Sequence, residues 1–258
     1  MEWVEAFYSK QEEWSGCYTS LPGPEDHERA QFVTAALAGQ MGRVLELGAG
    51  GGQSALATAK LGHEVTAIEL VARTAAHART LVPQAAPGTL HIVEGSFYTL
   101  PLPETFDVIC YWDGFGVGTD AQQRMLLQRV ARWLAPSGTV LMDINTPWYW
   151  ARASGRQMSA STFVRQYDFD ADGCRMLDHW WQAERPAERV TQSLRCYSPQ
   201  DLRLLVEGTG LVLEQVEPGG AVDYEAGTYA SSVPLEQAMQ YRALLRHDSE
   251  WRKTNGTT

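Results

Sequence analysis

The chain has 258 residues, of which 44% are hydrophobic, which is typical of one globular α/β domain with a sizeable core. Its formal net charge of −10, with no compensating basic run, argues against nucleic acid or an anionic membrane as a partner. No apolar stretch approaches the roughly 20 residues of a membrane span, and the acidic, aromatic N-terminus is unlike a signal peptide. The four cysteines form no CxxC pair, so we expect a cytoplasmic protein with reduced thiols and no metal site.

Two helices are expected before residue 40. The first has apolar residues at helical spacing from Trp3 to Trp14, and the second begins at Pro24 and ends near Gly39. From there, short strands rich in Val, Ile and Leu alternate with helices. The expected strands cover 43–47, 64–70, 90–95, 106–112 and 138–144, and the expected helices cover 52–61, 71–82 and 120–135. This alternation predicts an α/β, Rossmann-like, doubly wound and mostly parallel sheet with helices on both faces.

The pattern changes after Pro147. Two β-like runs within 161–182 flank the turn sequence "DADG", and a third antiparallel strand is expected at 188–197. A helix from 198 to 208, a core strand at 211–217, a helix at 234–247 and a polar, frayed tail complete the chain. We therefore expect one domain with four parts. These are an N-terminal helical lid (1–40), a cofactor-binding core (41–145), an inserted antiparallel β lid (146–197) and a segment that completes the core and ends in a helix (198–258).

The stretch "VLELGAGGGQSA" (44–55) places four glycines in five positions between a strand and a helix. Such a turn lets bare backbone approach a ligand. Gly50 and Gly52, with Glu69 about 20 residues on, also satisfy the dinucleotide pattern, so an NAD-dependent oxidoreductase is one alternative. Glu46 argues against it, because a carboxylate ~4 Å from a phosphate charge costs about 4 kcal/mol at an effective dielectric of ~20. S-adenosylmethionine has no phosphate and carries a sulfonium and an ammonium, so it suits Glu46 better.

On these residues the chain resembles the class I S-adenosylmethionine-dependent methyltransferases, over roughly residues 40–145 and more loosely to about 217. Further segments match that family in order along the chain. They are "VTAIEL" (65–70), "GSFYTLP" (95–101), "FDVICYWDGFG" (106–116) and "LAPSGTVLMDI" (134–144).

The resemblance implies that Glu69 binds both ribose hydroxyls and that the turn containing Ser96 and Phe97 cradles adenine. The family commonly has Asp where Ser96 stands, although a Ser hydroxyl can also accept a hydrogen bond. The remaining residues expected at the cofactor are Tyr8, Tyr18, Glu46, Gly48, Ala49, Gly50, Gly52, Leu70, Trp112 and Asp113. The residues expected at the acceptor pocket are Trp14, Phe115, Trp148 and Trp180.

The implied activity is transfer of a methyl group from S-adenosyl-L-methionine to N or O of a small molecule (EC 2.1.1.-), with S-adenosyl-L-homocysteine as the product. Asp113, just past the fourth strand, and His179 are the candidate catalytic residues, although a base is needed only if the acceptor arrives protonated. We expect a monomer or a homodimer. A non-catalytic module that binds the donor or its demethylated product is the alternative.

Overall fold

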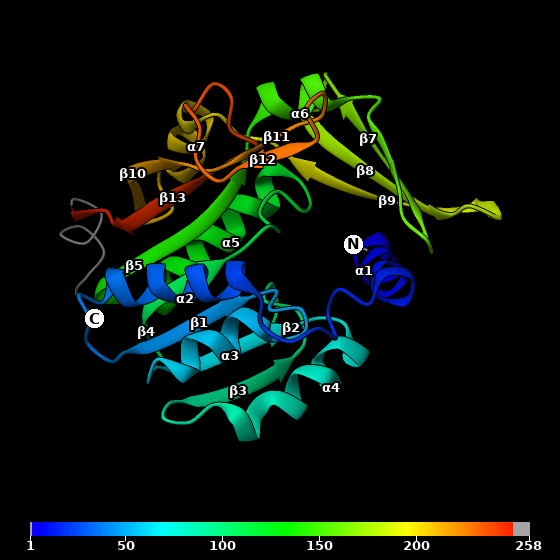
Figure 1. The fold of residues 1–258 in the computed structure, drawn as a ribbon. Helices are drawn as coiled ribbons and strands as arrows, with labels where there is room; N and C mark the ends of the chain where they lie inside the picture. The colour runs from blue at the N-terminus through cyan, green and yellow to red at the C-terminus, as the bar shows by residue number, and fades with distance from the viewer. Residues whose placement is uncertain (1, 250–258) are drawn as a thin grey trace.

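The computed structural model describes residues 2–249, and its core is a seven-stranded sheet in the order β10-β13-β5-β4-β1-β2-β3 (Figure 1). The strands are β1 (Arg43–Leu47), β2 (Glu64–Glu69), β3 (Thr89–Glu94), β4 (Phe106–Tyr111), β5 (Leu134–Asn145), β10 (Leu211–Pro218) and β13 (Gln240–His247). Strands β1 to β5 pair in parallel, whereas β13 is antiparallel to both β5 and β10. The expectation of a Rossmann-like, mostly parallel sheet is confirmed.

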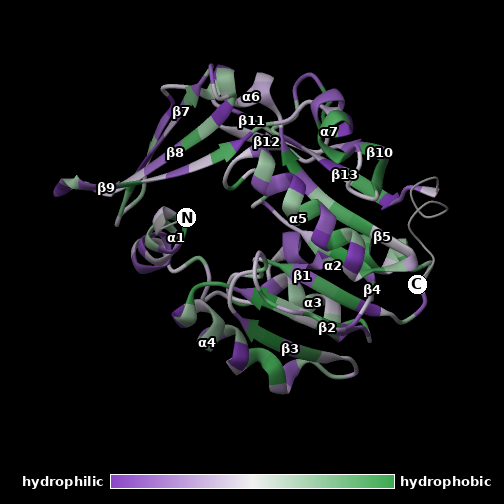
Figure 2. Cartoon of the chain, turned by 180° about the vertical axis from the view of Figure 1, so that it is seen from behind, coloured by the Kyte–Doolittle hydropathy of each residue, from purple (hydrophilic) through white to green (hydrophobic). Residues whose placement is uncertain are grey.

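Helices cover both faces of this sheet. On one face α2 (Pro24–Ala36) and α3 (Gln53–Lys60) pack on one set of strand residues, and on the other α5 (Asp120–Trp133) and α7 (Pro199–Val206) pack on the alternate set. Next to β3 lie α4 (Ala72–Leu81) and the short 3₁₀ helix η1 (Val82–Gln84). Because both faces are covered, the central strands are almost uniformly hydrophobic (Figure 2). Among residues 2–249, no helix is long and apolar enough to cross a membrane.

A second, antiparallel sheet follows α6 (Pro147–Ala153), and we call it the lid sheet. It consists of β6 (Gln157–Ser159), β7 (Val164–Asp170), β8 (Arg175–Gln182) and β9 (Arg185–Arg195). The inserted antiparallel sheet is confirmed, with β6 as a fourth strand beyond the three predicted. Helix α1 (Glu2–Ser15) contacts β9 and α4 and lies beneath the lid sheet in Figure 1. A small hairpin of β11 (Ala221–Asp223) and β12 (Thr228–Ala230) completes the fold.

The prediction of a helix at 234–247 is wrong, because residues Gln240–His247 form β13, which lies between β10 and β5 in the sheet. Tyr241, Ala243 and Leu245 are fully buried and alternate with less buried neighbours, as in a strand. Good helix formers in this segment suggested a helix, but pairing with β5 on one side and β10 on the other satisfies its backbone in an extended conformation. The polar tail, from residue 250 on, lies outside the described residues.

Candidate functional site

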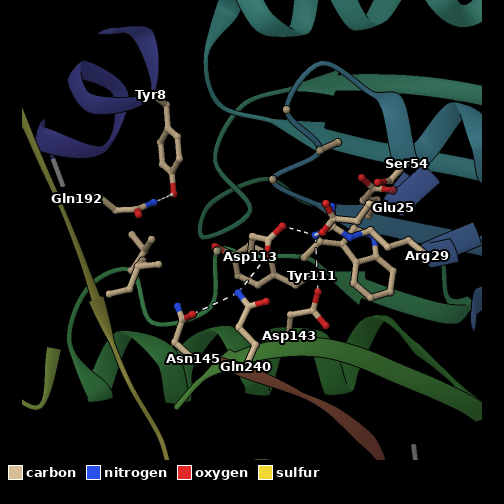
Figure 3. Close-up of a pocket in the computed structure, with 18 of the residues that line it drawn as sticks. Tyr8, Glu25, Arg29, Ser54, Tyr111, Asp113, Asp143, Asn145, Gln192 and Gln240 are labelled. Carbon is tan, nitrogen blue, oxygen red and sulfur yellow. Dashed lines mark hydrogen bonds and ion pairs between the residues drawn. The ribbon is translucent and has the colours of Figure 1, made fainter. Parts of the chain in front are cut away.

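A cavity of about 1430 Å³ lies between the carboxyl ends of the parallel strands and the lid sheet. Its wall includes the glycine turn, α1, α2, the loop after β4 and the first residues of β13 (Figure 3). A pocket for one drug-sized molecule usually occupies about 300–1,000 Å³, so this cavity has room for two ligands side by side. Open α/β sheets bind their ligands at this edge.

The glycine turn after β1 is packed against the N-terminal segment. A side chain at Gly51 would place its Cβ 1.7 Å from the Tyr18 carbonyl oxygen, and one at Gly50 would lie 2.8 Å from the Tyr18 ring. Gln53 holds the same segment, since its Nε2 donates to the Cys17 and Ser20 carbonyl oxygens at 3.3 Å each. Gly50 and Gly51 must therefore be glycines, because a side chain at either position would collide with the segment that covers the turn.

Glu46 lies at the bottom of the cavity beside this turn. Its side chain is 2% exposed, and Oε2 has no hydrogen-bond partner among residues 2–249. Burial raises the pKa of Glu46 to about 8, although the charge of Arg29 opposes this shift. A buried carboxylate without a hydrogen-bond partner is costly, so a cation bound beside Glu46 would stabilise its ionised form.

Glu69 ends β2 and is anchored by the backbone. The Val71 amide donates to its Oε1 at 2.7 Å, and the Gly50 amide donates to its Oε2 at 2.8 Å. Burial raises the pKa of Glu69, and these amide hydrogen bonds partly offset the shift. Each oxygen keeps a lone pair for a further donor, which is what recognition of two neighbouring hydroxyls requires.

Arg29 of α2 also lines the cavity and is surrounded by carboxylates. Its Nη2 contacts Glu25 at 2.9 Å and Asp143 at 3.8 Å, and it donates to Asp113 (Figure 3). Asp113 has a φ of 55°, which is unusual for a residue other than glycine, and the Gln240 amide donates to it at 3.0 Å. Although burial opposes it, the guanidinium of Arg29 holds the pKa of Asp113 below its ordinary value.

Asp143 lies deeper than Asp113, on β5. Its side chain is 8% exposed, and its Oδ1 lies 3.4 Å from Nε of Arg242 on the neighbouring strand. Burial and the nearby charge of Asp113 raise the pKa of Asp143 to about 7. Two carboxylates of different acidity therefore lie on the same wall of the cavity.

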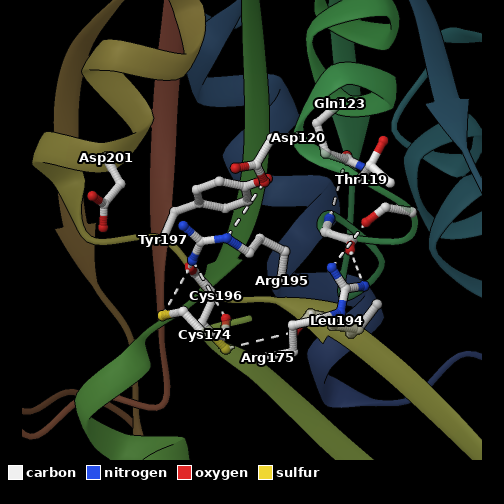
Figure 4. Close-up of polar contacts among 12 residues, drawn as sticks. Thr119, Asp120, Gln123, Cys174, Arg175, Leu194, Arg195, Cys196, Tyr197 and Asp201 are labelled. Carbon is white, nitrogen blue, oxygen red and sulfur yellow. Dashed lines mark hydrogen bonds and ion pairs between the residues drawn. The ribbon is translucent and has the colours of Figure 1, made fainter. Parts of the chain in front are cut away.

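The loop after β4 is fastened to the lid sheet. Val117 pairs with Leu194 of β9 through a β-bridge, and Arg175 donates to the carbonyl oxygens of Gly116 (3.2 Å) and Gly118 (2.9 Å) (Figure 4). A side chain at Gly116 would place its Cβ 2.3 Å from the Arg195 carbonyl oxygen. The core and the lid sheet are thus joined directly beside the cavity.

Most residues expected at the cofactor line this one cavity. They are Tyr8, Tyr18, Glu46, Gly48, Ala49, Gly50, Glu69, Leu70, Ser96, Phe97, Trp112 and Asp113. Gly52 is outside the lining; it precedes α3 with a φ of 82°, and its Cβ would lie 3.0 Å from Ala78. The Ser96 hydroxyl accepts from the Tyr98 amide at 3.2 Å and so helps to form its own turn.

The side chains expected at the acceptor pocket lie outside the cavity lining. Trp14 and Trp180 pack with Phe7 between α1 and the lid sheet, and Phe115 is fully buried in the core. Trp148 donates from Nε1 to the Leu235 carbonyl oxygen at 2.9 Å.

His179 also lies away from the cavity. It alternates along β8 with Asp178, and its Nδ1 lies 2.8 Å from the Thr191 hydroxyl on the outer face of the lid sheet. Burial lowers the pKa of His179. These placements give no support to a role for His179 in catalysis.

Several cavity residues had not been expected. They are Arg29, Asp143, Asn145, Arg165, Tyr167, Gln192, Gln240 and Arg242, among others. For Asp143 and Asn145 a signal was present, because both stand at the carboxyl end of a parallel strand, where ligands bind. The others come from α2, from the lid sheet and from β13, whose positions depend on long-range pairing.

Comparison with known proteins agrees with this architecture. A family described as "Methyltransferase domain" matches residues 44–138. The cypemycin N-terminal methyltransferase of a Streptomyces species is 30% identical over 149 residues, which is 57% of this chain and 57% of that protein. The chain is thus matched over little more than half the length of this curated relative.

Two solved structures share the fold over most of the chain. The CcbJ methyltransferase from Streptomyces caelestis has a TM-score of 0.69 and 22% identity, covering 88% of this chain and 91% of that one. The glycopeptide N-methyltransferase MtfA, complexed with S-adenosylmethionine, has a TM-score of 0.58 and 18% identity, covering 87% of each chain. The resemblance to class I methyltransferases is confirmed.

Proposed function

We propose that the chain transfers a methyl group from S-adenosylmethionine to a small molecule. The premise is that residues 44–138 match the methyltransferase-domain family and that the fold is that of the class I enzymes. The acceptor atom is nitrogen or oxygen. When bound, the donor supplies a methyl group on a positively charged sulfur that is a good leaving group.

The observation that supports this proposal most directly is the unpartnered, buried Oε2 of Glu46 beside the glycine turn. S-adenosylmethionine offers the missing cation through its ammonium, whereas the pyrophosphate of NAD would add negative charge at the same place. Glu69, fixed by two backbone amides, is available to the ribose hydroxyls. The cavity residues therefore fit this donor.

Other residues of the chain position the reactants. Arg29, held by its carboxylate neighbours, offers its remaining N–H groups to the donor's carboxylate. Asp113 stays ionised and faces the cavity, so it attracts a cationic acceptor. The N-terminal segment and the lid sheet exclude water. Holding two reactants in line contributes roughly 7–11 kcal/mol to such a reaction without any further catalytic group.

The charge of the cavity favours nitrogen over oxygen as the acceptor atom. Nine acidic side chains and three arginines line it. An excess of negative charge concentrates cations, and an amine arrives largely as a cation at neutral pH. The cypemycin relative is named an N-terminal methyltransferase and MtfA a glycopeptide N-methyltransferase, and both names are consistent with this preference.

Calorimetric titration with S-adenosylmethionine, S-adenosylhomocysteine and NAD tests the donor. We expect the first two to bind and NAD to fail; selective binding of NAD would refute the proposal. Consumption of the methyl donor is then measured over matched panels of amines and alcohols. Binding without any turnover would favour the non-catalytic module.

A further inference from the structure

The inner face of the lid sheet carries a polar row that packing does not require. The register pairs Tyr167 with Asp178 and Asp178 with Gln192, so these three side chains lie in one row across β7, β8 and β9. On one side of the row, Met176 and Leu194 form an apolar row. Since such a face of an antiparallel sheet is normally apolar, the polar row calls for another explanation.

The charges in this row are held in a fixed geometry. Arg165 donates to Asp178 from Nε, at 2.8 Å to Oδ1 and 3.0 Å to Oδ2, and from Nη2 at 2.7 Å to Oδ2, and the Asp178 side chain is fully buried. The guanidinium also stacks 4.6 Å from the Tyr167 ring centre and 5.1 Å from that of Trp180. A buried ion pair contributes little to stability compared with apolar residues of the same size. It does hold one arginine rigidly at the cavity wall.

The row retains unused hydrogen-bonding capacity toward the cavity. Gln192 donates from Nε2 to the Tyr8 hydroxyl at 2.8 Å, and both residues line the cavity (Figure 3). Within residues 2–249, no hydrogen bond uses Arg165 Nη1, the Tyr8 hydroxyl hydrogen or Gln192 Oε1. Burial and the charges of nearby carboxylates raise the pKa of Tyr8, so its hydroxyl remains a donor. Two donors and one acceptor are therefore available along one strip of wall.

We propose that Tyr8, Arg165 and Gln192 bind an amide group of the methyl acceptor, and we call these three residues the amide site. The amide carbonyl oxygen accepts from Arg165 and Tyr8, and the amide N–H donates to Gln192 Oε1. The neighbouring Met176 and Leu194 contact the acceptor's hydrocarbon part. This inference rests on the proposed function, because it assigns an acceptor class, amines that also carry a carboxamide or peptide bond.

A carboxylate fits the amide site less well than an amide. Asp178 already neutralises Arg165, and Glu69 and Asp113 also act on the Tyr8 hydroxyl. A further anion would be repelled by these groups and would leave Gln192 Oε1 without a donor.

The test uses the whole chain saturated with S-adenosylhomocysteine and titrated with leucinamide, leucine or leucine methyl ester. These probes share an amine and an apolar side chain and differ only at the carboxyl group. We expect leucinamide to bind roughly tenfold more tightly than leucine or leucine methyl ester. Only leucinamide has both a carbonyl oxygen for Arg165 and Tyr8 and an N–H for Gln192 Oε1. Equal affinities, tighter binding of leucine, or no binding of leucinamide would overturn the assignment.

Two variants assign the effect to the amide site. Gln192→Leu should reduce leucinamide binding by several-fold to roughly tenfold and leave S-adenosylhomocysteine binding intact, and Tyr8→Phe should reduce leucinamide binding by a similar factor. Gln166→Leu is the matched control, because Gln166 is on the same sheet, outside the cavity lining. Unchanged leucinamide affinity in a folded Gln192→Leu protein would overturn the inference. Failure of S-adenosylhomocysteine to bind the parent chain would instead refute the proposed function.

Discussion

Replacing Glu46 with glutamine should have opposite effects on donor binding and on stability. Burial raises the Glu46 pKa from its ordinary 4.5 to about 8, so roughly nine molecules in ten carry a neutral side chain at pH 7. A cationic donor binds the ionised form, because pairing with a cation lowers the pKa of Glu46. The donor affinity of the parent chain should therefore rise roughly 25-fold between pH 6.0 and 7.5, because the ionised fraction rises by that factor. The Glu46→Gln variant has no proton to lose at this position, so it should bind the donor weakly at every pH.

The stability effect follows from the same shift. In the unfolded chain, Glu46 is ionised at any pH above its ordinary pKa of 4.5. In the folded chain, it stays protonated up to about pH 8. The free energy of unfolding of the unliganded protein therefore falls as pH rises from 4.5 to 8, by a contribution on the order of 5 kcal/mol. The Glu46→Gln variant lacks this loss, so it should be more stable than its parent at pH 8.

Titration calorimetry across pH measures the first effect, and urea unfolding of the unliganded protein measures the second. Adenosine, which has no ammonium, should bind with little dependence on pH. Glu64→Gln changes an exposed acid on the neighbouring strand and should alter neither quantity. The reasoning is refuted if donor affinity in the parent does not depend on pH, or if Glu46→Gln binds the donor as tightly as the parent.

Three further predictions concern residues around the cavity. Glu69→Ala should weaken binding of S-adenosylmethionine by roughly 1.5–3 kcal/mol in calorimetry, because charge-assisted bonds to the ribose are lost; unchanged affinity in a folded variant would mean that the ribose lies elsewhere. Gly51→Ala should displace the segment around Tyr18, since the new Cβ would lie 1.7 Å from a carbonyl oxygen, and limited proteolysis should then cut that segment faster than in the parent. Trp180→Ala should lower the free energy of unfolding in urea by roughly 3–5 kcal/mol, because Trp180 packs with Phe7 and Trp14; an unchanged value would contradict that packing.

The part of the cavity around the glycine turn could be predicted from the chain without its structure. Glu46, Gly50 and Glu69 stand on strands and turns whose order follows from local patterns. Parallel strands joined by helices bring their carboxyl ends to one edge, so spacing along the chain is enough to place these residues together. Glu46 and Glu69 indeed line one cavity with the glycine turn.

The part of the cavity wall that β13 and the lid sheet form was decided by long-range pairing. Gln240 and Arg242 reach the cavity because β13 pairs with β5. This segment is rich in good helix formers, so its sequence did not predict a strand at that position. In the lid sheet, register selects Asp178 for the inner face and His179 for the outer one. Side chains alternate along a strand, so a shift of one residue would exchange the two, and only the packing of the lid sheet against α1 and the core selects between them.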